Sequence, residues 1–273
     1  MTAYSGVLRS MQPDRQPLRT VLFSDVDGTL LGPRGGLALT PPRMRALSLG
    51  IDIVLASSRT LAELRHLQRV LGIVGPLAAE NGAVLALPPS WGTRVGRSGS
   101  TQGRWAVHYL GESARRLMPR VRKAAALTGV DWRAISLAAL GGHAAKRTHS
   151  VLLRPGPYHR GLLESLRALG LDASLSGRWI TVTQCATKGR AVREVLARAA
   201  ASGTPYQLTA AIGDAANDAE MLRAVALPFV IRTPSGHHPE LARIPGAVLL
   251  RAEGLAGFRE AVRILLREVQ KRC

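Results

Sequence analysis

Two aspartates, Asp25 and Asp27, follow a short apolar run, and such a pair could perform acid–base or phosphoryl-transfer chemistry. The run covers residues 21–24, and Gly28 comes directly after the pair, where it lets the backbone turn sharply. Ligands of open parallel α/β sheets bind beyond the carboxyl ends of the strands, which is where these carboxylates would lie. An ordinary surface turn is the alternative, because Asp and Gly are common in loops.

Three later segments carry side chains of complementary chemistry. An apolar run over residues 51–56 ends in small hydroxyl residues and a cation, a helical pattern opens with a lysine, and an apolar run over residues 209–213 ends in carboxylates. In chain order these side chains are Ser57, Ser58, Arg59, Lys188, Asp214 and Asp218. Three of the four groups therefore stand at the end of an expected strand, which favours an active site over a surface turn.

This order of motifs resembles the haloacid dehalogenase superfamily. The resemblance rests on Asp-Val-Asp-Gly-Thr-Leu at residues 25–30, on Ser57, on Lys188, and on Gly-Asp-Ala-Ala-Asn-Asp at residues 213–218. Each motif alone is unspecific, but the four in this order are typical of that superfamily. The resemblance extends over nearly the whole chain from Val21 onward and implies an enzyme, a phosphoric monoester hydrolase.

Phosphate-ester hydrolysis needs a nucleophile and strong charge neutralisation. A carboxylate can attack phosphorus and form an aspartyl-phosphate, and we assign this role to Asp25. Asp27 is then placed to protonate the leaving oxygen and later to deprotonate water, as general acid and base. Lys188 would hold the nucleophile and the phosphoryl oxygens with its positive charge.

Several anionic groups around a phosphate require a divalent cation, and oxygen ligands suit Mg²⁺. Asp25, Asp214 and the backbone carbonyl of Asp27 are the expected ligands, and Asp218 would complete the shell or bind through water. The alternative is that Asp214 and Asp218 are a helix N-terminal acidic pair that is favoured by the helix dipole.

The segment after the second apolar run is expected to bind the substrate. Ser57 would donate its hydroxyl to the phosphate, and Ser58 would donate its backbone N–H. Arg59 would either bind a phosphate or carboxylate with two donors or merely cover the surface.

The elements that position these residues alternate between strand and helix. Thr40-Pro41-Pro42 is typical of a helix start, and Thr60 precedes a pattern that places four leucines on one helix face. Such alternation predicts an α/β fold with helices on both faces of a parallel sheet, a Rossmann-like doubly wound core. A final amphipathic helix is expected between residues 255 and 269.

Residues 88–183 differ in composition from the rest of the chain and include all of its tryptophans. Helices are expected around residues 117–127 and 162–169, with strands over residues 150–153 and 178–182. Asp25 and Ser57 are only 32 positions apart, whereas Ser57 and Lys188 are 131 positions apart. We therefore predict a core of residues 1–87 and 184–273 and an inserted α+β cap of residues 88–183. This placement resembles the type IIB branch, whose members mostly hydrolyse small sugar phosphates.

Several details are similar to the mannosyl-3-phosphoglycerate phosphatase group of that branch. They are Ser-Ser-Arg-Thr at residues 57–60, Glu-Asn-Gly at 80–82, Gly-Arg at 177–178, residues 187–192, and Gly-Leu-Ala-Gly-Phe at 254–258. The resemblance implies that Asn81 contacts the substrate and that Arg178 holds the carboxylate of a phosphoglycerate. Residues 146–150 lack the acidic residues that this group usually shows, so another phosphosugar remains open.

Composition bounds the remaining classes of function. The chain has 273 residues, 46% of them hydrophobic and 20% charged, which is ordinary for a globular protein. No apolar run approaches the roughly 20 residues of a membrane span, and the first twenty residues lack the apolar core of a signal peptide, so we expect a cytoplasmic location. Cys185 and Cys273 give no disulfide framework, and Cys185 is expected to pack as a small apolar group.

The formal charge of +19 leaves two further hypotheses open. A basic field attracts anionic substrates, which suits either the expected enzyme or a phosphatase of broad range on sugars and nucleotides. It would also suit a polyanion or nucleic-acid binder built on an inactive fold. We rank the binder lower because all the catalytic residue types are in place. The sequence carries no signal for the oligomeric state.

Overall fold

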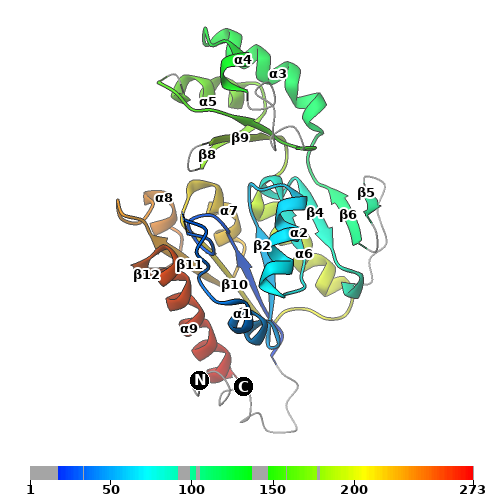
Figure 1. The fold of residues 1–273 in the computed structure, drawn as a ribbon, viewed down its shortest axis with the longest axis vertical. Coiled ribbons are helices and arrows are strands. Elements are labelled where there is room, and N and C mark those ends of the chain that lie inside the picture. The colour runs from blue at the N-terminus through cyan, green and yellow to red at the C-terminus, as the bar shows by residue number, and fades with distance from the viewer. Residues whose placement is uncertain are drawn as a thin grey trace.

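A computed structural model describes residues 18–32, 34–91, 99–102, 105–136, 147–157, 159–176 and 179–272. The larger part is a three-layer α/β core, and a smaller α+β part lies beyond one end of the core's strands (Figure 1). This confirms the predicted fold class. Among the described residues, no helix combines the length and apolarity needed to cross a bilayer.

The core is built on a nine-stranded sheet in the order β12-β11-β10-β1-β2-β3-β4-β6-β5. The six strands from β12 to β3 are parallel, and β4, β6 and β5 are antiparallel to their neighbours. The strands are β1 (Thr20–Ser24), β2 (Ile51–Ala56), β3 (Leu77–Ala79), β4 (Val84–Leu87), β5 (Gly99–Gln102), β6 (Trp105–Tyr109), β10 (Leu208–Gly213), β11 (Leu227–Arg232) and β12 (Val248–Glu253).

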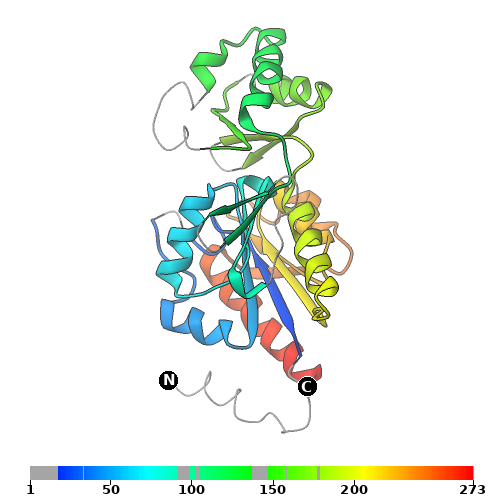
Figure 2. The same ribbon diagram turned by 90° about the vertical axis from the view of Figure 1, so that its right-hand side faces the viewer.

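Helices cover both faces of this sheet (Figure 2). One face carries α1 (Pro41–Ser48), α2 (Leu61–Leu71) and α9 (Gly254–Arg272), and the other carries α6 (Lys188–Ala201), α7 (Ala219–Arg223) and α8 (Pro239–Ala242). Successive residues of β1 alternate between the faces, with Leu22 in one hydrophobic cluster and Val21 and Phe23 in the other. All are buried, as expected for a parallel strand covered on both sides.

The smaller part, the cap, has its own three-stranded antiparallel sheet in the order β7-β9-β8. Its elements are α3 (Ala114–Leu127), α4 (Trp132–Ile135), β7 (Val151–Leu153), α5 (His159–Ala168), β8 (Asp172–Ser176) and β9 (Trp179–Thr183). Buried Leu117, Val121, Leu162 and Leu166 join the helices to the strands in one cluster. The helices lie on the far side of the cap sheet from the core (Figure 2).

The division between the two parts differs from the predicted boundary at residue 88. β6 pairs with β4, and β5 pairs with β6, so both strands extend the core sheet. The core sheet therefore continues beyond Pro88, although the amino-acid composition changes there. We place the entry into the cap between Tyr109 and Ala114, and the return to the core between Thr183 and Lys188.

Other local predictions have mixed outcomes. The helix over residues 162–169 is confirmed as α5, and the final amphipathic helix is confirmed as α9. β8 is a strand that the pattern does not predict. The helix over residues 117–127 is confirmed as α3, with Leu127 exposed at its end, and Cys185 is exposed rather than packed.

Helix α2 shows how the sequence fixes the segment that follows β2. The Thr60 hydroxyl accepts from the Glu63 backbone N–H, and the Glu63 carboxylate accepts from the Thr60 backbone N–H at 2.8 Å, a reciprocal capping box. Gly72 ends the helix in the left-handed conformation, with φ of 65°. Leu61, Leu64, Leu67 and Leu71 are buried, as the spacing predicts.

We expect Thr60→Ala to lower the free energy of unfolding by about 1 kcal/mol, because it removes the helix cap. Urea unfolding followed by circular dichroism measures the change. Thr40→Ala is the matched control, since Thr40 precedes α1 without a side-chain cap hydrogen bond. Equal losses in the two variants would contradict a stabilising role for the Thr60 cap.

Candidate active site

The carboxyl ends of β10, β1 and β2 lie side by side at the edge of the sheet that faces the cap (Figure 1). Parallel register brings Asp25, Ser57 and Asp214 together, because each follows one of these strands directly. Gly28 has φ of +86°, and a Cβ there would lie 2.8 Å from Asp214 Oδ2. The turn after Asp25 can therefore pass close to Asp214 only with glycine at this position.

The buried Lys188 side chain connects two carboxylates that are far apart in the chain. Lys188 Nζ donates to Asp25 Oδ1 at 2.5 Å and to Asp218 Oδ1 at 2.6 Å, and all three side chains are buried. Burial alone would lower the Lys188 pKa, but the carboxylates of Asp218 and Asp25 outweigh that effect and raise it. Lys188 is therefore a fixed positive charge at the centre of the site.

Asp218 is fully engaged by this network. Its Oδ1 accepts from Lys188, and its Oδ2 accepts from the backbone N–H groups of Asp214 and Ala215, both at 3.1 Å. The side chain thus closes the loop after β10 on itself and fixes the direction of Asp214.

Asp25, Asp214 and Asp218 each offer a carboxylate oxygen, and these oxygens lie within 4.8 Å of one another. Burial and the adjacent Asp218 raise the pKa of Asp214 to about 6. Burial also raises the Asp25 pKa well above its usual value, against the opposing effect of Lys188 and with the help of Asp218 and Asp214. One lysine does not balance three carboxylates, so the group suits a divalent cation with a preference for oxygen ligands.

Asp27 points to a different partner. The Arg59 guanidinium donates from Nε to Asp27 Oδ2 at 2.9 Å and from Nη2 to Asp27 Oδ1 at 2.7 Å. About half of the Asp27 side chain is exposed. Both oxygens of the Asp27 carboxylate accept from one planar guanidinium group, so Arg59 fixes the orientation of that carboxylate.

The other predicted substrate residues lie around this centre. Ser57 is buried, and its Oγ accepts from the Arg59 backbone N–H at 3.2 Å. Asn81 accepts from Asn217 Nδ2 at 3.1 Å and donates to Ser174 Oγ of β8 at 3.4 Å, which connects the core to the cap. The predicted contact of Arg178 lies outside the described residues.

Two residues at the edge of the site have contacts that the motifs do not predict. The Thr29 hydroxyl donates to Asp214 Oδ1 at 3.4 Å, although the motif gives Thr29 no separate role. Arg147, in the cap, donates to the Ser58 carbonyl oxygen at 2.7 Å. Its position in a segment of ordinary basic composition carries no signal that could have identified it.

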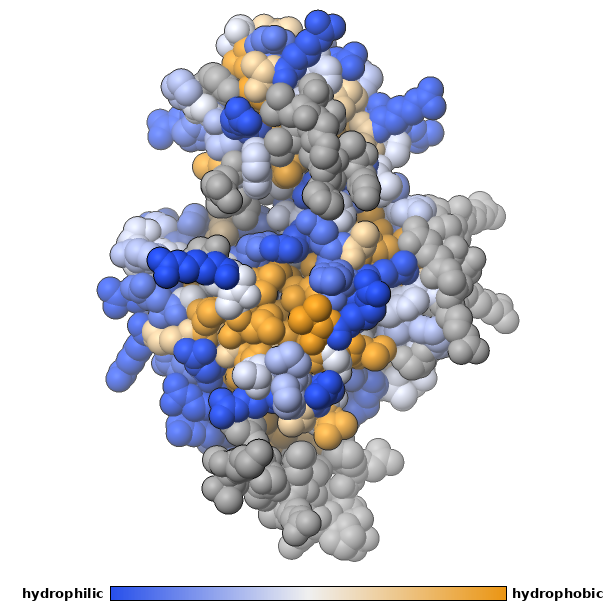
Figure 3. Space-filling view, viewed as in Figure 1, coloured by the Kyte–Doolittle hydropathy of each residue, from blue (hydrophilic) through white to orange (hydrophobic). Residues whose placement is uncertain are grey.

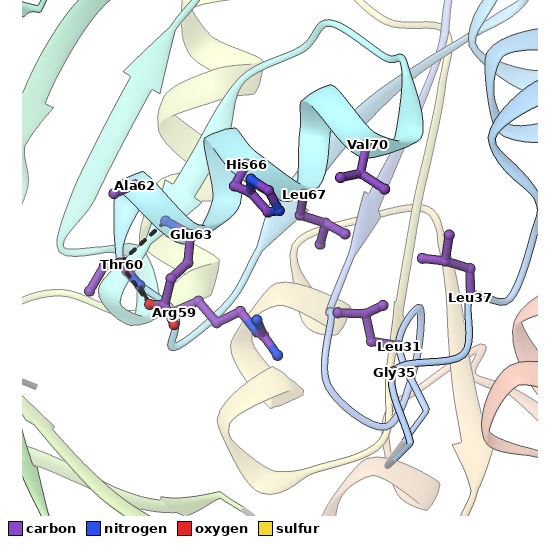
Figure 4. A pocket seen from close by; sticks show the side chains of 10 residues that line it. All are labelled: Leu31, Gly35, Leu37, Arg59, Thr60, Ala62, Glu63, His66, Leu67 and Val70. Carbon is purple, nitrogen blue, oxygen red and sulfur yellow. Dashed lines mark hydrogen bonds between the residues drawn. The ribbon is translucent and has the colours of Figure 1, made fainter. Parts of the chain in front are cut away.

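Two cavities border the site. One of 320 Å³ lies between core and cap, and Lys188, Asn217, Asn81 and Ser174 contribute to its wall. The other, of 490 Å³, lies between α2 and the loop after β1, with Arg59 at its rim (Figure 4).

The second cavity is largely aliphatic. Leu31 and Leu37 face Leu67 and Val70 across it (Figure 4). Hydrophobic residues gather on this face of the core (Figure 3). The cavity beside Lys188 has the more polar wall, but Asp25, Ser57 and Asp214 are not among the residues that line it.

Comparison with known proteins agrees with this geometry. Residues 22–91 match the family model described as haloacid dehalogenase-like hydrolase. A protein of Persephonella marina named glucosyl-3-phosphoglycerate/mannosyl-3-phosphoglycerate phosphatase is 25% identical over 93% of this chain and 99% of its own.

Solved structures share the fold. A Thermoplasma acidophilum protein is 15% identical with a TM-score of 0.67, covering 93% of this chain and 99% of its own. The subclass IIB sugar phosphatase BT4131 is 15% identical with a TM-score of 0.60, covering 92% and 99%. With the motifs assembled around Asp25 and Lys188, these matches show that the chain is similar to haloacid dehalogenase-like hydrolases, and they support a phosphatase.

Proposed function

We propose that this protein is a Mg²⁺-dependent phosphatase of a small phosphorylated sugar metabolite, a glycosyl-3-phosphoglycerate such as mannosyl-3-phosphoglycerate. The observation that carries the proposal is the buried contact of Asp25 with Lys188, with the Asp214 carboxylate beside it. This ion pair is buried, unlike an ordinary ion pair on the surface, and it holds the Asp25 carboxylate in the position that the proposed attack on phosphorus requires.

In the proposed reaction, an Asp25 carboxylate oxygen attacks phosphorus, and the bond between phosphorus and the 3-oxygen of the glycerate breaks. Asp27 gives a proton to that leaving oxygen and later takes one from the water that hydrolyses the aspartyl-phosphate. Arg59 keeps the Asp27 carboxylate oriented through its two hydrogen bonds. Lys188 stabilises the negative charge that gathers on the phosphoryl oxygens.

The carboxylate group also supports a bound Mg²⁺. Asp25, Asp214 and the Asp27 backbone carbonyl would hold it, whereas both oxygens of Asp218 already accept hydrogen bonds. We therefore propose that Asp218 acts through Lys188 and the loop, or reaches the ion through water. When bound, the ion would neutralise charge on the phosphate and on the attacking carboxylate.

The substrate assignment rests on the Persephonella marina relative and on the motifs of the mannosyl-3-phosphoglycerate phosphatase group. Phosphoglycerate carries a carboxylate besides the phosphate, and an arginine-rich site suits such an anion. Ser57, Ser58 and Asn81 would hold the phosphate and sugar, and Arg178 the carboxylate. A flat activity profile over sugar phosphates and nucleotides would instead favour a phosphatase of broad range.

We expect Asp25→Asn to lower phosphate release by a factor on the order of 10³ or more, because the amide cannot act as the nucleophile. Release is measured on mannosyl-3-phosphoglycerate, glucosyl-3-phosphoglycerate and a panel of simple sugar phosphates. Asp52→Asn is the matched control, since Asp52 lies near the start of β2, where it accepts from Tyr206 and Arg19. A variant at residue 25 with more than about a tenth of the activity would overturn the nucleophile assignment.

Activity should disappear with a chelator and return with added Mg²⁺. Asp214→Asn should weaken Mg²⁺ binding by about tenfold or more, because one anionic ligand is lost. Isothermal titration calorimetry measures this affinity without reference to turnover. Glu220→Gln, an acidic residue at the rim of the polar cavity, serves as the control, with affinity unchanged. Unaltered Mg²⁺ affinity in the Asp214 variant would count against this site.

Without metal, the raised Asp214 pKa predicts a pH dependence of stability. A carboxyl group whose pKa is about 6 when folded and near 4 when unfolded favours the folded state at low pH, and this contribution is lost as pH rises through 6. Urea unfolding in chelator at pH 5 and pH 7.5 measures it. In wild type the free energy of unfolding should fall between pH 5 and pH 7.5, and in Asp214→Asn it should fall less. The same fall in both proteins would contradict a raised Asp214 pKa.

A further inference from the structure

The turn between β3 and β4 has an unusual backbone. Glu80, Asn81 and Gly82 have φ values of 53°, 57° and 88°, so three consecutive residues are left-handed. A non-glycine residue in this region is energetically unfavourable and persists where its surroundings enforce it. A Cβ on Gly82 would lie 2.2 Å from the Thr187 carbonyl oxygen, so the turn packs directly against the residue before Lys188.

The backbone of this turn is bound to the substrate segment after β2. Glu80 N–H donates to the Arg59 carbonyl oxygen at 2.8 Å, and Asn81 N–H donates to the Ser57 carbonyl oxygen at 2.9 Å. A displacement of the turn would therefore move the residues expected to hold the phosphate.

The Glu80 side chain is almost fully buried, yet the catalytic steps do not use it. Its Oε1 accepts from the Thr148 backbone N–H at 3.0 Å and from the Thr148 hydroxyl at 3.2 Å. Its Oε2 accepts from the His149 backbone N–H at 3.0 Å and from the Ser150 hydroxyl at 2.6 Å. A core carboxylate thus receives four hydrogen bonds from one cap segment, which offsets the cost of burying its charge.

Arg147 makes the converse contact. It precedes the same three cap residues, and its Nη1 donates to the Ser58 carbonyl oxygen of the core at 2.7 Å and to Ser150 Oγ at 3.2 Å. Glu80 and Arg147 also attract each other electrostatically. The core anion therefore binds the cap backbone, and the cap cation binds the core backbone.

From this reciprocal arrangement we propose that Glu80 and Arg147 are positioning residues that hold cap segment 147–150 on the strand ends of the core. The inference rests on the proposed phosphatase function. The pair fixes how the cap faces Ser57, Ser58 and Arg59, so it governs substrates that contact both parts of the protein. A small aryl phosphate, which needs only the core groups for its phosphate, depends on it much less.

Glu80→Gln tests the proposal, because the amide keeps the size of the side chain but replaces an acceptor with a donor that faces N–H and O–H groups. We expect kcat/KM for mannosyl-3-phosphoglycerate to fall about 10- to 100-fold, and that for p-nitrophenyl phosphate to change less than about threefold. Arg147→Met should show the same split. Glu164→Gln, at an exposed residue of α5, is the matched control and should behave as wild type with both compounds.

Hydrogen exchange separates failure of this inference from failure of the proposed function. The Thr148 and His149 amides should exchange faster in Glu80→Gln than in wild type, whether or not any phosphosugar is hydrolysed. If Glu80→Gln does not fold, Ser150→Ala removes one of the four donors and should show the same exchange in weaker form. Wild-type exchange at residues 148–150, or equal loss of activity on both compounds, would overturn the proposal.

Discussion

The site depends on one buried ammonium group. Lys188 lies between Asp25 and Asp218, and without its charge the three neighbouring carboxylates would face each other in a region that excludes most water. Removing one partner of such a buried pair leaves an uncompensated charge, which typically costs 3–5 kcal/mol. Lys188 also opposes the rise that burial causes in the Asp25 pKa and fixes the direction of that carboxylate, while it makes no contact with Asp214.

The topology of the sheet explains how distant residues reach this ammonium group. Placing β1 between β10 and β2 sets Asp25 next to Asp214 and Ser57, although these residues are far apart in the chain. Helix α6 lies against the sheet and begins with Lys188, so its first residue is directed at the carboxyl end of β1. Each of these candidate site residues is thus held at the end of a buried element.

The sequence predicts the core and its motifs well because their signals are local. Apolar runs that end in Asp25, Ser57 and Asp214 mark parallel strands, and the capping box at Thr60 marks α2. Contacts across the sheet are different. The pairing of β6 with β4 follows no local pattern, so a change of composition at residue 88 gives the wrong boundary. The pairing of Arg59 with Asp27 and the burial of Glu80 also depend on partners that only folding brings near.

The orientation of the inserted cap relative to the core needs contacts beyond the four sequence motifs. The cap is joined to the core by two short connections, near residues 110–113 and 184–187, and two such connections leave a rigid body free to tilt. Glu80 and Arg147 add attachments beside the first connection, where the Ala114 backbone N–H also donates to the Thr148 carbonyl oxygen, and the Asn81–Ser174 hydrogen bond adds another. These contacts oppose the tilt that the two connections alone would allow. The left-handed turn at Glu80 and Asn81 is then the local strain that these attachments require, and it lies between the segment of Ser57 and Arg59 and the residue before Lys188.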